Sequence, residues 1–392
     1  MNFEPLRAEL EALAAQALKR RLQVVDEVLP GGRVRVGERV LLNLSSNDYL
    51  GLALNPRLIA AAQESAARWG TGASASRLVV GHLALHEAVE AKLASFKGTE
   101  AALIFSTGYM ANLGVISALM GAGDLVFSDR LNHASIYDGI KLSGGTLSRY
   151  PHRDLTRLED LLKRSPAAKR RLIVTDSVFS VDGDLAPLEG LVWLKEKYGA
   201  WLMVDEAHAT GVLGPTGAGY AQALGLTERV DIHMGTFSKA LGSLGGYVAG
   251  ERTLIEYLYN KARSLIYSTA LPPPVLGAID AALDIVRQEP ERRAYLLEMA
   301  QNFRQELGQA GFDTLGSETQ IVPVLVGKNE TTLEFAARLR RRGLMAVALR
   351  PPTVPPGKAR VRFSLSAAHA REDLAKAGEI IRETGREMKL IP

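Results

Sequence analysis

Short apolar runs alternate with helical patterns through the middle of the chain. Between about residues 83 and 250, stretches with apolar residues three or four positions apart separate these runs. The runs include Ala101 to Phe105, Leu125 to Ser128, Leu172 to Asp176 and Trp201 to Asp205. This alternation predicts an α/β domain with a mainly parallel sheet.

The two ends of the chain follow other patterns. Leu6, Leu10 and Leu13 have the spacing of an amphipathic N-terminal helix, and residues 34–44 contain two short apolar runs around Gly37, as in a hairpin. After residue 270, long helical patterns are followed by short strands, which predicts a small α+β domain. We therefore expect an N-terminal helix and hairpin over 1–50, a large α/β domain over 51–285 and a small α+β domain over 286–392.

Composition narrows the class of protein. With 47% hydrophobic and 23% charged residues over 392 positions, the chain can bury a large core. It has no cysteine, which excludes disulfides, thiolate nucleophiles and Cys-based metal sites, and we expect no metal site. No apolar run approaches the roughly 18 residues of a membrane span, and the N-terminus lacks a signal-peptide pattern. We expect a cytoplasmic protein without a membrane partner.

The net charge of +4 would suit an anionic partner, either nucleic acid or a phosphorylated small molecule. The basic residues are dispersed, however, apart from short clusters at 169–171 and 340–342, and no basic face is interleaved with aromatic residues. We interpret these clusters as solvated surface and expect no nucleic-acid partner. A non-catalytic nucleic-acid-binding protein remains the alternative from another class.

Polar residues close two of the apolar runs. In open α/β sheets, ligands bind beyond the carboxyl ends of the strands. One run ends in Asp205, and the run from Val230 ends before Lys239, so both side chains could face one crevice. A lysine at such a place can form a Schiff base, and a carboxylate can hold a cofactor pyridine nitrogen in its protonated state. A surface lysine and a helix-capping aspartate are the alternatives.

A phosphate site has its own candidates. Gly108 and Tyr109 follow the strand ending at Phe105 and open a helix, where free backbone N–H groups bind anions. Thr236, just before the lysine, could donate further, and His133 could lie over an aromatic cofactor. An ordinary glycine turn and a structural histidine are the alternatives.

Several familiar motifs do not apply. Asp205 to His208 spells the DEAH box of helicases, but the chain has no phosphate-binding loop of the Gly-x-x-x-x-Gly-Lys-Ser/Thr kind. Gly70 to Gly72 follows a helical stretch and lacks the third glycine of a dinucleotide fingerprint. There is also no zinc-protease His pair and no Gly-x-Ser-x-Gly elbow.

Four segments, in this order and spacing, resemble the α-oxoamine synthase family of fold type I pyridoxal-phosphate enzymes. They are Ser45 to Leu52 (SSNDYLGL), Asp205 to Gly211 (DEAHATG), Thr236 to Gly242 (TFSKALG) and Arg350 to Pro355 (RPPTVP). The similarity runs over nearly the whole chain. It implies a fold type I transferase with a large, mainly parallel domain and a small C-terminal domain, and it implies a homodimer.

The resemblance also implies roles for the catalytic residues. Lys239 would hold pyridoxal 5'-phosphate covalently, Asp205 would pair with the pyridinium nitrogen, and His133 would stack on the ring. His208 and Ser180 would contact the phenolic oxygen. The catalytic set expected from the resemblance is therefore Lys239, His133, Asp205 and His208.

Further cofactor contacts follow from the same resemblance. The backbone at Gly108 and Tyr109, together with Thr236, would bind the phosphate group. Ser268 or Thr269 would reach across the dimer interface to the neighbouring site.

The resemblance implies a substrate pocket as well. Arg362 would grip the carboxylate of the amino acid, for which a bidentate guanidinium is well suited. Asn47 and Thr353 would line the same pocket. Arg21 is the better match to the arginine associated with acyl-CoA binding, and Arg20 is the alternative.

The implied activity is an acyltransferase reaction that joins an amino acid to an acyl-CoA with loss of carbon dioxide. The motifs look most like those of members that use L-alanine with pimeloyl-CoA or a pimeloyl carrier protein in biotin biosynthesis. Members that use glycine with acetyl-CoA or succinyl-CoA are the closest alternative, since selectivity over one methyl group amounts to only about 1–3 kcal/mol. An aminotransferase is a more distant one.

Overall fold

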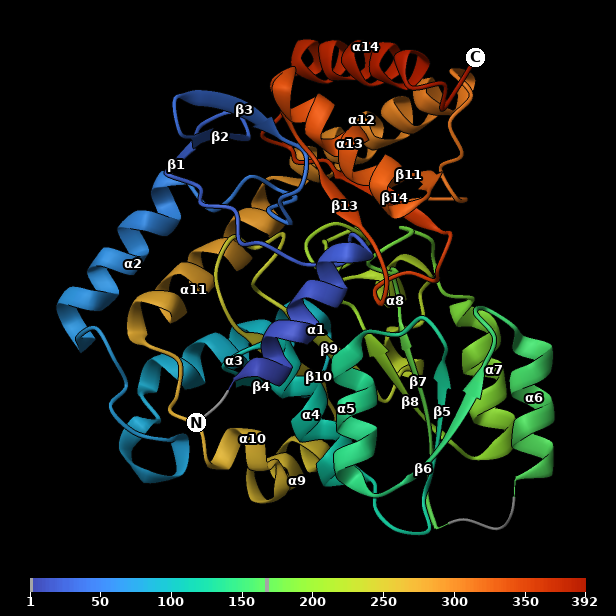
Figure 1. Cartoon of the computed structure of the whole chain (residues 1–392). Helices are drawn as coiled ribbons and strands as arrows, with labels where there is room; N and C mark the ends of the chain where they lie inside the picture. The colour runs from blue at the N-terminus through green and yellow to red at the C-terminus, as the bar shows by residue number, and fades with distance from the viewer. Residues whose placement is uncertain (1–2, 166–168) are drawn as a thin grey trace. The chain divides into compact units, whose positions relative to one another are not determined.

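The contacts of the chain divide it into two compact units. The computed structural model describes residues 3–165 and 169–392 (Figure 1). Unit 1 comprises Met1–Tyr49, Val181–Asp184 and Tyr295–Pro392, and unit 2 comprises Leu50–Ser180 and Leu185–Ala294. The three-part division expected from the sequence stays a prediction.

Unit 2 is built on a seven-stranded sheet in the order β4-β10-β9-β8-β7-β5-β6. Its strands are β4 (Ala101–Phe105), β5 (Leu125–Asp129), β6 (Thr146–Tyr150), β7 (Arg171–Asp176), β8 (Trp201–Asp205), β9 (Ile232–Thr236) and β10 (Gly246–Gly250). β10 runs antiparallel to both of its neighbours, and the other pairs are parallel. The predicted mainly parallel sheet is confirmed.

Helices precede, connect and follow these strands. They are α2 (Pro56–Trp69), α3 (Ala84–Lys97), α4 (Gly108–Leu119), α5 (Ala134–Ser143), α6 (Leu155–Arg164), α7 (Leu188–Tyr198), α8 (Tyr220–Ala223), α9 (Arg252–Lys261), α10 (Arg263–Ile266) and α11 (Pro273–Gln288). A π-helical turn, η1 (Arg77–Gly81), and a 3-10 turn, η2 (Thr227–Arg229), complete the unit. Helix α11 packs against α2 and α3.

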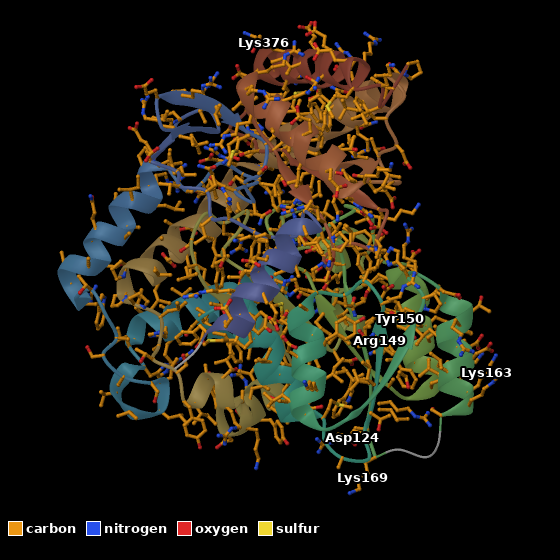
Figure 2. The ribbon with its side chains drawn as sticks, viewed as in Figure 1. Asp124, Arg149, Tyr150, Lys163, Lys169 and Lys376 are labelled. Atoms are coloured by element: carbon orange, nitrogen blue, oxygen red, sulfur yellow. The ribbon has the colours of Figure 1, made fainter. Side chains whose placement is uncertain are left out.

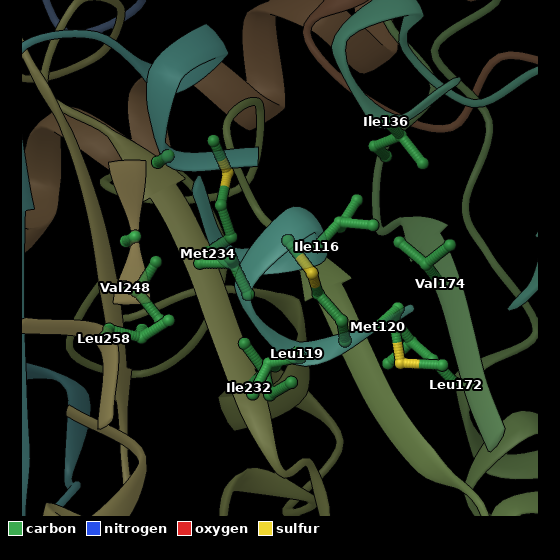
Figure 3. Close-up of a cluster of buried hydrophobic side chains, with 14 of the residues drawn as sticks. Ile116, Leu119, Met120, Ile136, Leu172, Val174, Ile232, Met234, Val248 and Leu258 are labelled. Carbon is green, nitrogen blue, oxygen red and sulfur yellow. The ribbon is translucent and has the colours of Figure 1, made fainter. Parts of the chain in front are cut away.

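Two hydrophobic clusters cover the two faces of this sheet. Successive side chains of a strand point to opposite faces. Thus Leu172 and Val174 of β7 belong to a cluster with α4 and α9, whereas Ile173 belongs to a cluster with α6 and α7. Figure 3 shows Ile116 of α4 and Met120, which directly follows α4, in the first cluster, among side chains of several strands. Because β7, β8 and β9 are buried on both faces, the polar residues that follow them are positioned by a packed scaffold.

Unit 1 contains two smaller sheets. Strands β1 (Glu27–Leu29), β2 (Arg33–Val36), β3 (Arg39–Asn43) and β12 (Leu344–Met345) form one, and β11 (Ile321–Gly327), β14 (Ala359–Ser364) and β13 (Val347–Leu349) form the other. The helices are α1 (Glu4–Ala15), α13 (Asn329–Arg341) and α14 (Arg371–Glu387), and α12 (Pro290–Gln309) begins at the boundary with unit 2. The predicted N-terminal helix, hairpin and C-terminal α+β region are thereby confirmed. The leucines of α1 are exposed.

Charged side chains lie on many separate elements. Figure 2 shows Lys163 on α6, Lys169 before β7 and Lys376 on α14, each pointing outward. In the cluster at 340–342, Arg341 pairs with Glu334 at 2.9 Å and Arg342 pairs with Glu383. These ion pairs place acidic side chains next to the arginines, so the cluster does not form a basic face. Among the described residues, no helix is both long enough and apolar enough to cross a membrane.

Candidate active site

The ends of β8 and β9 bring four predicted residues together in unit 2. Strand β8 ends at Asp205 and continues into a turn that carries His208, and β9 ends at Thr236, three residues before Lys239. The two strands are parallel neighbours, so both turns leave the same edge of the sheet. Lys239 Nζ lies 2.8 Å from His208 Nε2. The sequence predicts that Asp205 and Lys239 lie at the same edge of the sheet, but it does not predict the lysine–histidine hydrogen bond.

The Asp205 carboxylate is fixed through both of its oxygens. Oδ1 accepts a hydrogen bond from the backbone N–H of Ala207 at 2.9 Å, and Oδ2 accepts one from Asn112 Nδ2 at 2.8 Å. The residue is 5% exposed. A buried carboxylate held in one orientation is suited to a cationic or N–H partner in the adjoining cavity.

His133 opens helix α5 and faces the same cavity. Its Nδ1 accepts from the backbone N–H of Ser135 at 3.3 Å, so the imidazole caps the helix, and its own backbone N–H donates to Asp176 at 3.1 Å. Desolvation lowers the pKa of His133, and Lys239 adds to this effect while Asp205 opposes it. The helix-capping role of His133 and its expected contact with a cofactor ring are therefore compatible.

The N-terminus of α4 supplies the candidate anion site. Gly108 and Tyr109 are its first two residues, and the Thr107 side chain caps it by accepting from Met110 N at 3.1 Å. A Cβ added to Gly246 would lie 2.6 Å from the backbone N and Cα of Gly108. Glycine at position 246 thus allows β10 to approach the helix start closely.

A cavity of about 180 Å³ joins these groups. Eight of the predicted residues line it: Gly108, Tyr109, His133, Ser180, Asp205, His208, Thr236 and Lys239. Ser268 and Thr269 line a different, much smaller cavity, where the Ser106 hydroxyl donates to the Thr269 carbonyl oxygen at 3.2 Å. Their expected role in the site of a second protomer stays a prediction.

Three polar lining residues were missed from the sequence. Asn112 lies one turn into α4 after Gly108, Ser135 lies two residues after His133, and Asp176 closes β7. Burial raises the pKa of Asp176 well above its usual range, and the charge of Asp205, its neighbour on β8, adds to this effect. Asp176 could have been found, because it is a polar residue closing a predicted strand. Asn112 and Ser135 have no such signal.

The predicted substrate residues lie in unit 1. Arg362 on β14 donates to the Asn47 side-chain oxygen at 2.8 Å, and Asn47 also accepts from the Tyr49 hydroxyl at 3.1 Å. Thr353 is exposed and accepts from Arg20 at 3.4 Å. Arg21, the preferred candidate for acyl-CoA, is exposed. The structure therefore brings Asn47 together with Arg362, and Thr353 together with Arg20.

A larger cavity, of about 780 Å³, lies at the opposite ends of the same strands. Trp201 and Ile232, which line it, are the first residues of β8 and β9. Its lining contains neither lysine nor histidine. Size alone does not identify an active site, and of these two cavities it is the smaller one that combines a lysine, imidazoles and a carboxylate at strand carboxyl ends.

The smaller cavity fits pyridoxal phosphate by its chemistry. It offers an amine at Lys239, a fixed carboxylate at Asp205 and a helix N-terminus at Gly108, and these match an aldehyde, a ring nitrogen and a phosphate group. Asp176 Oδ1 and Asn112 Oδ1 are buried and have no hydrogen-bond partner within the described chain. A polar ligand would satisfy such atoms. No cluster of metal-ligating side chains occurs among residues 3–165 and 169–392.

Known proteins resemble this chain over nearly its whole length. The model of the aminotransferase class I and II family matches residues 39–381. The 8-amino-7-oxononanoate synthase of Citrifermentans bemidjiense is 52% identical over 386 residues, which are 98% of this chain and 98% of that protein. A solved serine palmitoyltransferase variant from S. paucimobilis, with a bound PLP–myriocin aldimine, superposes with a TM-score of 0.95 at 32% identity, over 99% of this chain and 98% of that one. The structure of 8-amino-7-oxononanoate synthase from Francisella tularensis has a TM-score of 0.77 at 28% identity, over 88% of this chain and 98% of that one.

Proposed function

The chain belongs to the aminotransferase class I and II family, and from that premise we propose that it catalyses the reaction of its 8-amino-7-oxononanoate synthase relatives. The enzyme joins L-alanine to pimeloyl-CoA, or to a pimeloyl carrier protein, and releases 8-amino-7-oxononanoate, the thiol and carbon dioxide. This is a step of biotin biosynthesis. The cavity that contains Lys239, His208 and Asp205, in a chain 52% identical to such a synthase, carries the proposal.

Pyridoxal phosphate is the cofactor, and when bound it withdraws electrons from the α-carbon of the amino acid. We assign the amine of Lys239 to its attachment and, once free, to removal of the α-proton. Lys239 Nζ is 2.8 Å from His208 Nε2, so a proton can be held between the two groups. Asp205 is assigned to the ring nitrogen, because its carboxylate is buried and held at both oxygens.

The remaining assignments follow the geometry of the cavity. Gly108 and Tyr109 offer N–H groups at the start of α4 for the phosphate. Thr236 joins them, although its hydroxyl already donates to the Gly245 carbonyl oxygen at 2.5 Å. His133 is assigned to the ring face, and Ser180 to the phenolic oxygen together with His208.

Unit 1 supplies the groups assigned to the substrates. The Arg362 guanidinium is assigned to the alanine carboxylate, and its bond to Asn47 keeps it oriented. Thr353 is assigned to the same pocket. Arg21, with Arg20 as the alternative, is assigned to the acyl-CoA.

We also propose a homodimer that works in the cytoplasm. Leu78, Val79 and Val80 on η1 and Tyr267 after α10 are 58–73% exposed, which a second copy would cover. Ser268 and Thr269 directly follow Tyr267, which supports their assignment to the partner's site. Size-exclusion chromatography with light scattering should give twice the 42.3 kDa chain mass, and cell fractionation tests the location.

Thiol release with a chromogenic disulfide tests the reaction. The protein contains no cysteine, so only the released thiol reacts. We expect L-alanine with pimeloyl-CoA to exceed glycine with acetyl-CoA or succinyl-CoA, and Lys239→Ala to abolish release. Preference for a glycine pair would instead indicate a 2-amino-3-ketobutyrate CoA ligase or a 5-aminolevulinate synthase. Turnover by Lys239→Ala would refute the assignment of the lysine.

A further inference from the structure

Asn112 lines the cavity of unit 2 that contains Lys239. Its side chain is 1% exposed and comes from the second turn of α4. The one amide nitrogen donates to Asp205 Oδ2 at 2.8 Å and to Ser135 Oγ at 2.9 Å. An amide nitrogen has two hydrogens, so both are used. The opposite orientation of the amide would place its oxygen against the Asp205 carboxylate, which is unfavourable.

The hydrogen bond from Asn112 to Ser135 determines the direction of the hydrogen bond between Ser135 and His133. Ser135 Oγ lies 2.7 Å from His133 Nδ1. Because this hydroxyl accepts from Asn112, its own hydrogen is available for His133 Nδ1. The backbone N–H of Ser135 is directed at the same ring nitrogen, at 3.3 Å. Two donors therefore converge on Nδ1, which must be the unprotonated nitrogen of a neutral ring.

We propose that Asn112 is a positioning residue of this cavity, whose amide nitrogen orients the Asp205 carboxylate and, through Ser135, holds His133 as the tautomer protonated on Nε2. The inference rests on the proposed function, since it concerns two groups assigned to the cofactor. Its consequence is electrostatic. A neutral His133 does not add a positive charge close to Lys239, and an oriented Asp205 remains the anion available to the ring nitrogen.

The unmodified enzyme provides the first test. In ¹⁵N-histidine-labelled holoenzyme, the chemical shifts of the ring nitrogens distinguish a protonated from an unprotonated nitrogen. The His133 signals are assigned by their loss in His133→Gln. We expect Nε2 protonated and Nδ1 unprotonated at neutral pH. A His133 protonated on Nδ1 would overturn the proposal, whatever the substrates of the enzyme prove to be.

The second test replaces the amide by a carboxylate of the same shape. In Asn112→Asp both donors are lost, and the new carboxylate repels Asp205 and attracts the Ser135 hydroxyl away from His133. We expect the dissociation constant of pyridoxal phosphate to rise at least tenfold and the His133 shifts to move. Asn260→Asp is the matched control, because this exposed asparagine on α9 donates only to the Glu256 carbonyl oxygen in the described contacts.

Ser135→Ala separates the two parts of the network. It removes the hydroxyl between Asn112 and His133 and leaves the bond to Asp205 in place. We expect the His133 shifts to move, while the dissociation constant of pyridoxal phosphate changes less than threefold. This variant keeps the proposal testable if Asn112→Asp does not fold. Unchanged His133 shifts in Ser135→Ala, or unchanged cofactor affinity in folded Asn112→Asp, would contradict the proposal. Neither readout depends on which thioester the enzyme accepts.

Discussion

A buried ion pair involves the residue that directly follows Asp205 and the end of strand β8. Lys97, the last residue of α3, pairs with Glu206, and their side chains are 2% and 0% exposed. Lys97 also donates to the Ala218 carbonyl oxygen, and Glu206 accepts from the backbone N–H of Ala221 at 2.9 Å. The pair therefore connects α3, the end of β8 and the loop before α8.

We predict that Lys97→Met destabilises the enzyme by about 3–5 kcal/mol, the usual cost of leaving one partner of a buried pair uncompensated. Burial by itself raises the pKa of Glu206, but Lys97 and His233 outweigh burial and lower that pKa to about 2. Glu206 is therefore ionised at pH 7, and its contribution to stability is lost only as the pH falls from about 4.5 towards 2. With roughly 2.1 cal/mol/K of unfolding entropy per residue, a loss of about 4 kcal/mol lowers the Tm of a 392-residue chain by about 5 °C.

Calorimetry of the holoenzyme at pH 7, together with urea unfolding, measures this effect. Lys92→Met is the matched control, because Lys92 is on the same helix and pairs with Asp280 and Asp284, whose side chains are 43% and 40% exposed. Lys92→Met should lower the free energy of unfolding by about 1 kcal/mol or less. Combining Lys97→Met with Glu206→Gln should cost less than the sum of the two single changes, since no unpaired charge remains. The reasoning fails if Lys97→Met costs no more than Lys92→Met, or if the two single effects simply add.

Three further predictions concern other buried sites. Asp176 has a raised pKa, so the folded chain keeps a proton that the unfolded chain releases, and stability falls as the pH rises above about 4. Asp176→Asn should reduce this fall, measured as the urea midpoint at increasing pH, and an unchanged slope would contradict the prediction. Burial lowers the pKa of His369 from 6.5 to about 4, so up to about 3 kcal/mol of stability should be lost as the pH falls from 6.5 to 4. His369→Gln should flatten this dependence of stability on pH. Gly246→Ala should lower the Tm by several degrees, because the new methyl group meets the Gly108 backbone, whereas Gly308→Ala, which has open space around it, should not; equal melting temperatures for these two variants would refute the clash.

The sequence predicted the buried strands well and the exposed or glycine-flanked strands poorly. Strand β8 begins and ends where the apolar run from Trp201 to Asp205 does. Strand β6 was missed, because this edge strand is largely accessible and contains Ser148 and Arg149. Strand β10 was missed as well, because Gly246 and Gly250 at its ends suggest a turn. Apolar content identifies a strand that is buried on both faces and fails for the others.

The candidate site was predictable where chemistry followed a strand, and unpredictable where it depended on contacts far apart in the sequence. Asp205 and Lys239 could be identified because each follows an apolar run. Asn112 contacts Asp205, 93 positions later, and no local pattern indicates that contact. The tautomer of His133 likewise depends on Ser135 and on a helix from another part of the chain. Such hydrogen bonds exist only after the sheet has assembled.

The antiparallel strand β10 also has a consequence for the time at which the enzyme can fold during synthesis. Strand β4 is an edge strand joined to the sheet by β10 alone, and β4 ends at Phe105 whereas β10 begins at Gly246. About 140 residues must therefore be translated between the two, which takes roughly 7–30 s at about 5–20 residues per second. During that interval β4 and the start of α4 have no place in the sheet, so a nascent chain that already contains Lys239 cannot yet close the cavity around it.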